Sequence, residues 1–145
     1  MNGTLRNNII MNCNDAGIYL NQAKATKIYH NTLYATTGIE VRFTASTADI
    51  ANNVTTRIAK RDGGTFTSRT NFIGTNTQLQ GIFVNPRLGD YHLRSGTLIQ
   101  SKGSNLRTTV PQDMCGQSRD TIPDLGAIEY ISGSTCPRTV LDSYR

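Results

Sequence analysis

The chain has 145 residues, a net charge of +5 and only 17% charged residues, which suits a single domain and excludes most two-domain enzymes. It contains 20 Thr and 13 Asn but only 2 Glu and 4 Lys. Thr favours strands, Asn favours turns, and Glu and Lys favour exposed helix faces, so this composition argues against a helix bundle.

The sequence has neither a run of about 18 apolar residues that would predict a membrane span nor an apolar N-terminal signal segment. Its basic residues are scattered, apart from Arg57, Lys60 and Arg61, and it has no motif typical of nucleic-acid binding. We therefore expect a solvated basic surface, with no nucleic-acid or membrane partner. Such a surface also suits an acidic polysaccharide.

The cysteines are Cys13, Cys115 and Cys136, and none of them belongs to a CxxC pair. A disulfide between Cys115 and Cys136 would leave Cys13 over, and three reduced thiols are the alternative, which spacing alone does not exclude. No metal site is expected from these residues.

The first half of the chain contains an internal repeat. Residues 5–10, 28–33 and 50–55 each have an apolar residue, an Asn three positions later and a short apolar step. The Asn residues, Asn8, Asn31 and Asn53, are 23 and 22 residues apart, and Gly17–Leu20 and Gly38–Val41 repeat at 21 residues. A period near 22 without a regular Leu pattern predicts a parallel β-solenoid of about four rungs.

The repeated Asn residues have a structural explanation. Asn tolerates the left-handed backbone of a sharp bend, and amides stacked at one bend can form a hydrogen-bonded ladder. We therefore expect Asn8, Asn31 and Asn53 at the bends between strands, rather than in a ligand or glycan site.

Apolar positions in the repeat define the expected core. We expect Ile9, Leu33 and Val54 to point into the solenoid, with Ile18 and Ile39 on another sheet. The aromatic residues Tyr29, Tyr34 and Phe43 could pack in the core or form an exposed platform for sugars, and core packing is the commoner outcome on strands.

The C-terminal half has a different pattern. Residues 83–96, FVNPRLGDYHLRSG, read as a strand, a turn and a strand, and they precede LIQSKG (98–103), DMCGQSR (113–119) and PDLGAIEY (123–130). In order and spacing, residues 70–131 resemble the C-terminal end of right-handed parallel β-helix proteins. The resemblance is to the pectate-lyase-like and chondroitinase-B-like superfamily with a choice-of-anchor Q type ending.

This resemblance implies an all-β domain over residues 1–145. Rungs are expected in residues 1–74, terminal rungs and a closing motif in 75–131, and a tail in 132–145. Asp124 and Gly126 take structural positions at a turn, where an Asp side chain commonly caps backbone groups. The motif's usual second Asp is replaced by Cys115, which removes the basis for a cation or turn role there. Relatives of this kind are carbohydrate-directed and mostly secreted or attached to the cell surface.

A polysaccharide lyase must neutralise a uronate carboxylate and abstract a neighbouring proton. The candidate catalytic residues are Lys27, His30, Glu40 and Arg42, and the candidate ligand-binding residues are Tyr29 and Arg42. Glu40 and Arg42 share an exposed face if Ile39 and Val41 point inward, although an ordinary salt bridge between rungs is the favoured explanation. Ca²⁺ is expected only if the chain is such a lyase, and no other cofactor or metal is expected.

The leading hypothesis is therefore a truncated or miniature β-helix domain that is non-catalytic alone and binds polysaccharide weakly. A lyase-like enzyme and a structural self-assembly module are the alternatives. The chain is short for this fold and resembles the C-terminal piece of a longer β-helix or a naturally shortened one. Its exposed apolar first rung predicts a homo-oligomer formed through that rung.

Overall fold

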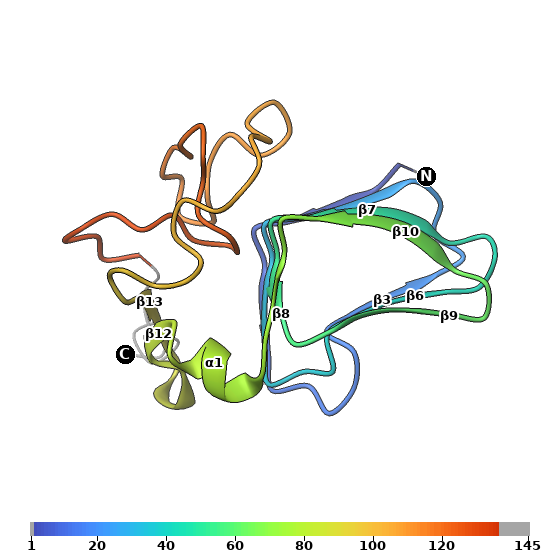
Figure 1. The fold of residues 1–145 in the computed structure, drawn as a ribbon, viewed down its shortest axis with the longest axis horizontal. Helices are drawn as coiled ribbons and strands as arrows, with labels where there is room; N and C mark the ends of the chain where they lie inside the picture. Colours follow the sequence, from blue (N-terminus) through green and yellow to red (C-terminus); the bar gives the residue numbers. More distant parts are fainter. Residues whose placement is uncertain (1, 137–145) are drawn as a thin grey trace.

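The computed structural model describes residues 2–136, which form a parallel β-solenoid with an irregular segment against one side (Figure 1). The solenoid has about three turns, and each turn contributes one short strand to each of three sheets. The expected all-β parallel solenoid is thus confirmed. No helix in the described residues is long and apolar enough to cross a membrane.

The three sheets are named here A, B and C. Sheet A contains β1 (Thr4–Arg6), β4 (Thr26–Tyr29), β7 (Thr47–Ala51) and β10 (Thr65–Arg69). Sheet B contains β2 (Ile9–Met11), β5 (Thr32–Tyr34), β8 (Val54–Thr55) and β11 (Phe72–Ile73). Sheet C contains β3 (Ile18–Asn21), β6 (Ile39–Arg42) and β9 (Ile58–Arg61). All neighbouring strands in these sheets are parallel.

The solenoid ends after β11, when its fourth turn has added a strand to sheets A and B but not to sheet C. Thr75 begins the helix α1 (Asn76–Gln80) with a capping box, in which Thr75 and Gln78 each bind the other's backbone N–H. This local start directs the chain away from the position of a further strand in sheet C. The terminal rungs expected within residues 75–131 are therefore not formed, because that segment adds no strand to sheets A, B or C.

The bends between sheets A and B depend on two adjacent residues with separate roles. The first residue of each bend has a positive φ, between 48° and 58°. From the first bend to the fourth, this residue is Asn7, His30, Asn52 and Thr70. The repeated Asn follows it and supplies the hydrogen bonds. The expected left-handed conformation thus lies one residue earlier than the sequence repeat suggested, because the ladder Asn must keep its backbone N–H aligned with the next rung.

The solenoid interior is filled by alternate residues of the three sheets. Ile28, Leu33, Ile39, Val41 and Ile50 belong to one cluster and are almost completely buried. Burying aliphatic side chains of this size contributes roughly 1.5–3 kcal/mol each.

Two of the expected core residues face the other way. In sheet B, Ile9 and Val54 both align with Thr32, whereas Leu33 aligns with Ile10. Ile9 and Val54 belong to the apolar cluster outside sheet B rather than to the solenoid interior. The prediction for them was wrong because residues on both sides of this strand are apolar, and a shift of one residue exchanges the two faces.

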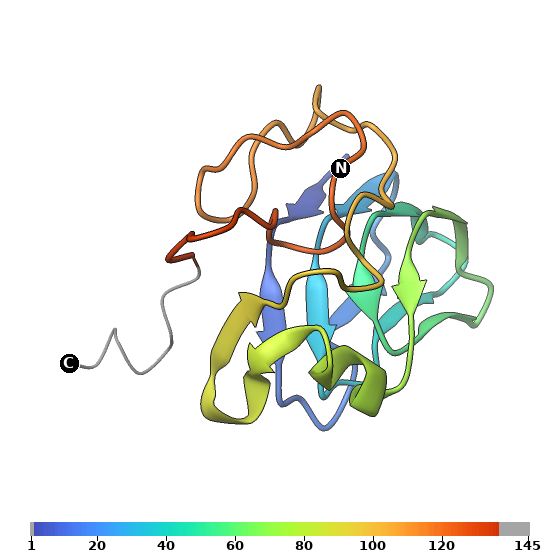
Figure 2. The same ribbon diagram turned by 60° about the vertical axis from the view of Figure 1, so that its left-hand side comes forward.

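The outer face of sheet B is covered by the C-terminal half of the chain (Figure 2). The covering elements are α1, β12 (Phe83–Asn85), the 3₁₀ turn η1 (Pro86–Leu88), β13 (Asp90–Leu93) and the irregular residues 94–136. β12 and β13 form an antiparallel hairpin, as the Pro86 and Gly89 turn predicted. Its buried Phe83 and Tyr91 pack in one cluster with Tyr34 and Val54 of the solenoid.

Candidate functional site

The four candidate catalytic residues lie in three separate places. Lys27 is exposed on sheet A, His30 is buried at the bend between sheets A and B, and Glu40 and Arg42 lie on sheet C. Only Glu40 and Arg42 share a surface, so the fold does not bring the four together around one substrate position.

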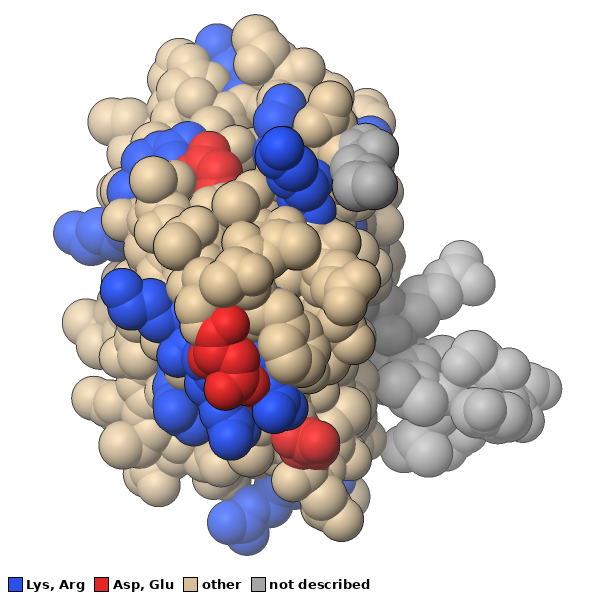
Figure 3. Space-filling model, turned by 90° about the vertical axis from the view of Figure 1, so that its right-hand side faces the viewer, with Lys and Arg blue, Asp and Glu red and all other residues tan. Residues whose placement is uncertain are grey.

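Glu40 and Arg42 point outward from sheet C, because Ile39 and Val41 between them are buried inside the solenoid. Glu40 pairs with Arg61 of the next rung at 3.5 Å, and Arg42 forms an ion pair with Asp62. These are the cross-rung salt bridges that the sequence favoured over a catalytic pair. Figure 3 shows the adjacent side of the molecule, where the chain turns from sheet C to sheet A and basic side chains lie around acidic ones.

A second charged group lies on the outer face of sheet A. Asp49 accepts hydrogen bonds from Tyr29, Thr67 and Arg69. Burial acts to raise the pKa of Asp49, but these hydrogen bonds outweigh it and lower the pKa below its ordinary value. The carboxylate is therefore held ionised and is a poor proton acceptor at neutral pH.

Tyr29 does not form an open platform in this arrangement. Its side chain is 4% exposed and packs with Ala51 and Val110, and the Arg69 guanidinium lies 6.0 Å from the ring centroid. Burial and the hydrogen bond to Asp49 raise the pKa of Tyr29. A sugar ring could stack on Tyr29 only after Arg69 or the covering segment had moved.

His30 is completely buried beneath the C-terminal segment. Its Nδ1 lies 3.3 Å from the Gly126 carbonyl oxygen, and its Nε2 lies 2.9 Å from the Asn52 amide nitrogen. A neutral ring donates to the carbonyl and accepts from the amide. Burial, with a contribution from the nearby Arg119 charge, lowers the pKa of His30 to about 3. This geometry makes His30 part of the docking contact between rung and closing segment, without access to a substrate.

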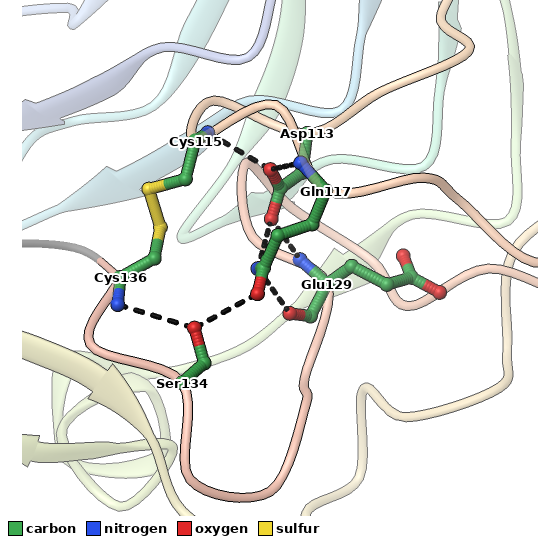
Figure 4. Close-up of a disulfide and its surroundings, with 6 residues drawn as sticks. All are labelled: Asp113, Cys115, Gln117, Glu129, Ser134 and Cys136. Carbon is green, nitrogen blue, oxygen red and sulfur yellow. Dashed lines mark hydrogen bonds between the residues drawn. A yellow bond between two sulfur atoms is a disulfide. The ribbon is translucent and has the colours of Figure 1, made fainter.

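The DMCGQSR motif is organised by Asp113 (Figure 4). The Asp113 carboxylate accepts hydrogen bonds from the backbone N–H groups of Cys115, Gln117 and Glu129 and from the Gln117 side chain. Beside it, Cys115 is joined to Cys136 by a disulfide, and Cys13 is the free cysteine of the described residues. Cys115 thus closes a covalent loop beside the Asp113 carboxylate.

The PDLGAIEY segment contains a buried ion pair. Arg119 donates to Glu129 at 3.0 Å and also to the Asn7 side chain and the Gly126 carbonyl. Burial raises the pKa of Glu129 to about 7, and the nearby Asp124 charge adds to the shift. Asp124 accepts from the backbone N–H groups of Ser101 and Tyr130, which is the capping role expected from its place at a turn.

The closing segment approaches the second rung closely at Gly126. Gly126 has a φ of 87°, and a Cβ there would lie 2.5 Å from the Thr32 hydroxyl oxygen. The next residue, Ala127, donates its N–H to that same hydroxyl at 3.0 Å. Only glycine permits this approach, which explains its place in the motif.

Several important residues were not identified from the sequence. Asp49 and Arg69 complete the group around Tyr29, and Arg119 connects the closing segment with the first rung. Asp49 could have been found because it stands 22 residues after Lys27, at the same position of the next rung. Arg119 could have been found as the last residue of the DMCGQSR motif.

These surfaces are suited to binding charge more than to moving protons. On the outer faces of sheets A and C, Asp49, Glu40 and the adjacent Asp62 are each paired with Arg. Lys27 on the outer face of sheet A and Lys60 at the open edge of β9 are exposed, and neither makes an ion pair with an acid of the described residues. Residues 2–136 contain no cluster of three or more His, Cys, Asp or Glu side chains that could hold a metal ion.

Comparison of the chain with protein-family models, curated proteins and solved structures finds no match.

Proposed function

We propose that this chain is a non-catalytic β-solenoid domain that binds acidic polysaccharide through exposed basic side chains of sheets A and C. The observation that carries the proposal is the pairing of charges on the outer surfaces of these sheets. Their carboxylates are each paired with an Arg, whereas Lys27 on the outer face of sheet A and Lys60 at the open edge of sheet C remain exposed and available to an anion. Exposed Lys side chains attract polyanions by charge without strict geometry, which suits weak binding.

The separation of the candidate catalytic residues supports binding rather than catalysis. A lyase needs a charge-neutralising group and a base within hydrogen-bond reach of the same sugar. Lys27 lies on β4, Glu40 and Arg42 lie on β6 in a different sheet, and His30 is buried.

The sequence resemblance to pectate-lyase-like and chondroitinase-B-like proteins supports a carbohydrate ligand. The Cys115–Cys136 disulfide supports a secreted or cell-surface location, because disulfides persist mainly in oxidising compartments.

Binding to polygalacturonate, an acidic polysaccharide, tests this proposal. We expect the chain to be retarded in affinity electrophoresis through gels containing polygalacturonate, with retardation lost as salt is added. The Lys27→Ala, Lys60→Ala double variant should bind several-fold more weakly. Lys102→Ala is the matched control, since Lys102 is also exposed but belongs to the closing segment and not to sheet A or sheet C.

Two results would contradict the proposal. Equal retardation of the double variant and the unaltered chain would remove the basic surface as the binding site. Release of unsaturated uronides from polygalacturonate by the purified chain, followed by ultraviolet absorbance, would show that the domain is catalytic.

A further inference from the structure

The end of the solenoid formed by its first rung is an incomplete stacking surface. We call this the first-rung face and define it by the strands β1, β2 and β3, each of which is the first strand of its sheet. A hollow of about 530 Å³ opens there and is lined by Leu5, Ile10, Ile18 and their neighbours. We propose that the first-rung face binds a further parallel β-solenoid rung, supplied by another polypeptide segment, with an Asn at its corner.

The direction of the Asn ladder specifies this ligand. The side chain and backbone nitrogens of Asn8 donate to the Asn31 Oδ1 at 2.8 and 3.1 Å. Asn31 donates in the same way to Asn53, and Asn53 to Asn71. Each Oδ1 therefore receives donors from the preceding rung. Within the described residues the Asn8 Oδ1 receives none, so the first-rung face offers an acceptor for an amide and a backbone N–H.

The apolar part of the face has the same pattern as the contacts between rungs inside the molecule. Leu5 aligns with Ile28 in sheet A, and Ile10 aligns with Leu33 in sheet B. Ile28 and Leu33 are 0% exposed because the first rung covers them, whereas Leu5 is 37% exposed. The first-rung face thus continues the interface that the rungs form with one another, and a further rung would bury it in the same way. Completing it would bury apolar surface and extend three parallel sheets together.

The opposite end of the solenoid is built differently, and this excludes a second copy stacked head to tail. Lys60 of β9 aligns with the fully buried Val41, so a charged residue occupies an inward position of the last rung in sheet C. An inward charge at a sheet edge opposes further strand addition. In a head-to-tail stack that placed β1 of a second copy on β10 in register, Arg69 would lie against Arg6. Since sheet A has four strands and sheet C three, β3 of that copy would also be one strand spacing too far from β9 to pair with it. The occupant is therefore a rung without these charges.

A tandem chain tests the proposal directly. A copy of residues 25–46, which form the second rung, is fused before Asn2 as the probe. We expect the copy to fold onto the first-rung face, to become resistant to protease and to raise the Tm by about 5 °C or more in a single transition. The matched control carries Asn31→Ala within the copy only. It should give a clearly smaller increase, because the amide can no longer donate to Asn8.

As a second control, a scrambled copy with the same 22-residue composition should leave the Tm unchanged. Three results would overturn the proposal. The fused copy could remain protease-sensitive with no change in Tm. The Asn31→Ala control could stabilise as strongly as the intact copy, in which case the ladder does not select the ligand. Light scattering could show that the chain without the fused copy forms a dimer. In this case Leu5→Lys would dissociate the dimer, and the fused copy would fail to prevent it. A second copy, paired first rung to first rung, would then occupy the face.

Discussion

The solenoid and the closing segment satisfy their backbone hydrogen bonds in different ways. In residues 2–73 the groups are paired strand to strand in three parallel sheets, and the Asn ladder repeats one contact at every rung. In residues 94–136 there is almost no strand, and buried carboxylates and one guanidinium bind the backbone instead. Because buried backbone groups must be paired in either region, the closing segment depends on a few side chains, whereas the solenoid spreads its stability over many equivalent contacts.

The strongest test of this difference is the removal of Arg119. Arg119→Met should lower the free energy of unfolding by about 3–5 kcal/mol, because it leaves the buried Glu129 carboxylate without its partner and also breaks the contact with Asn7. Urea unfolding followed by circular dichroism measures the loss. Arg107→Met in the same segment is the control and should change little, since Arg107 is exposed. A loss of less than about 1 kcal/mol for Arg119→Met would show that the buried pair does not hold the segment.

The disulfide should have the next largest effect. Its cysteines are 21 residues apart, and the chain-entropy relation assigns a loop of this length about 3 kcal/mol of stabilisation. The Cys115→Ala, Cys136→Ala variant should lose about that amount in urea unfolding. Cys13→Ala, which removes the free cysteine, should leave the unfolding free energy nearly unchanged. Similar losses in the two variants would contradict a specific role for the disulfide.

An Asn in the middle of the ladder tests the solenoid in the same way. Asn53→Ala removes the acceptor of the Asn31 N–H and the donors to Ile28 and Ala51. Leaving such buried groups unpaired should cost about 2–3 kcal/mol. Asn8→Ala is the matched control at the exposed end of the ladder and should cost less than about 1 kcal/mol. Equal costs at the two positions would show that the ladder contributes through local bends and not through buried hydrogen bonds.

The sequence allowed prediction of the solenoid but not of everything packed on it. The spacing of Asn8, Asn31 and Asn53 was sufficient because every rung repeats the same requirement at one bend. The direction of Ile9 and Val54 was not predictable from that spacing, since both faces of sheet B are buried and alternation gives no signal there.

The closing segment was harder to predict because its contacts join residues far apart in the chain. Arg119 binds Asn7 across 112 positions, and His30 meets Gly126 across 96. No local pattern encodes such pairs, and only the capping role of Asp124 could be inferred from its neighbours. Among the candidate catalytic residues, the outward direction of Glu40 and Arg42 was predictable from the sequence. The burial of His30 beneath the closing segment was not.

His30 lies where the two regions meet, and acid should weaken that contact. Its pKa is about 3 in the folded chain against 6.5 for the free side chain, so between these values the unfolded state binds the extra proton. The contribution of His30 is complete above about pH 6.5 and is lost as the pH falls, by roughly 2 kcal/mol at pH 5. His30→Asn, which tolerates the positive φ, should lack this component when urea unfolding is compared at pH 7 and pH 5. Both chains retain Glu129, whose raised pKa gives a dependence of opposite sign over about pH 4.5–7. Identical pH dependence of the two chains would contradict the assignment.

The smallest effect is expected on the exposed surface of sheet C. Glu40→Gln removes the ion pair with Arg61, whose side chain is 55% exposed, and exposed pairs of this kind contribute about 0.5 kcal/mol or less. The unfolding free energy should therefore stay within about 0.5 kcal/mol of the unaltered chain. The same change frees the Arg61 guanidinium, so binding to polygalacturonate should become tighter if the surfaces of sheets A and C bind polyanions. Weaker binding after Glu40→Gln would mean that Glu40 contacts the ligand itself. A large loss of unfolding free energy would mean that the stability of this surface depends on single side chains as much as that of the closing segment does.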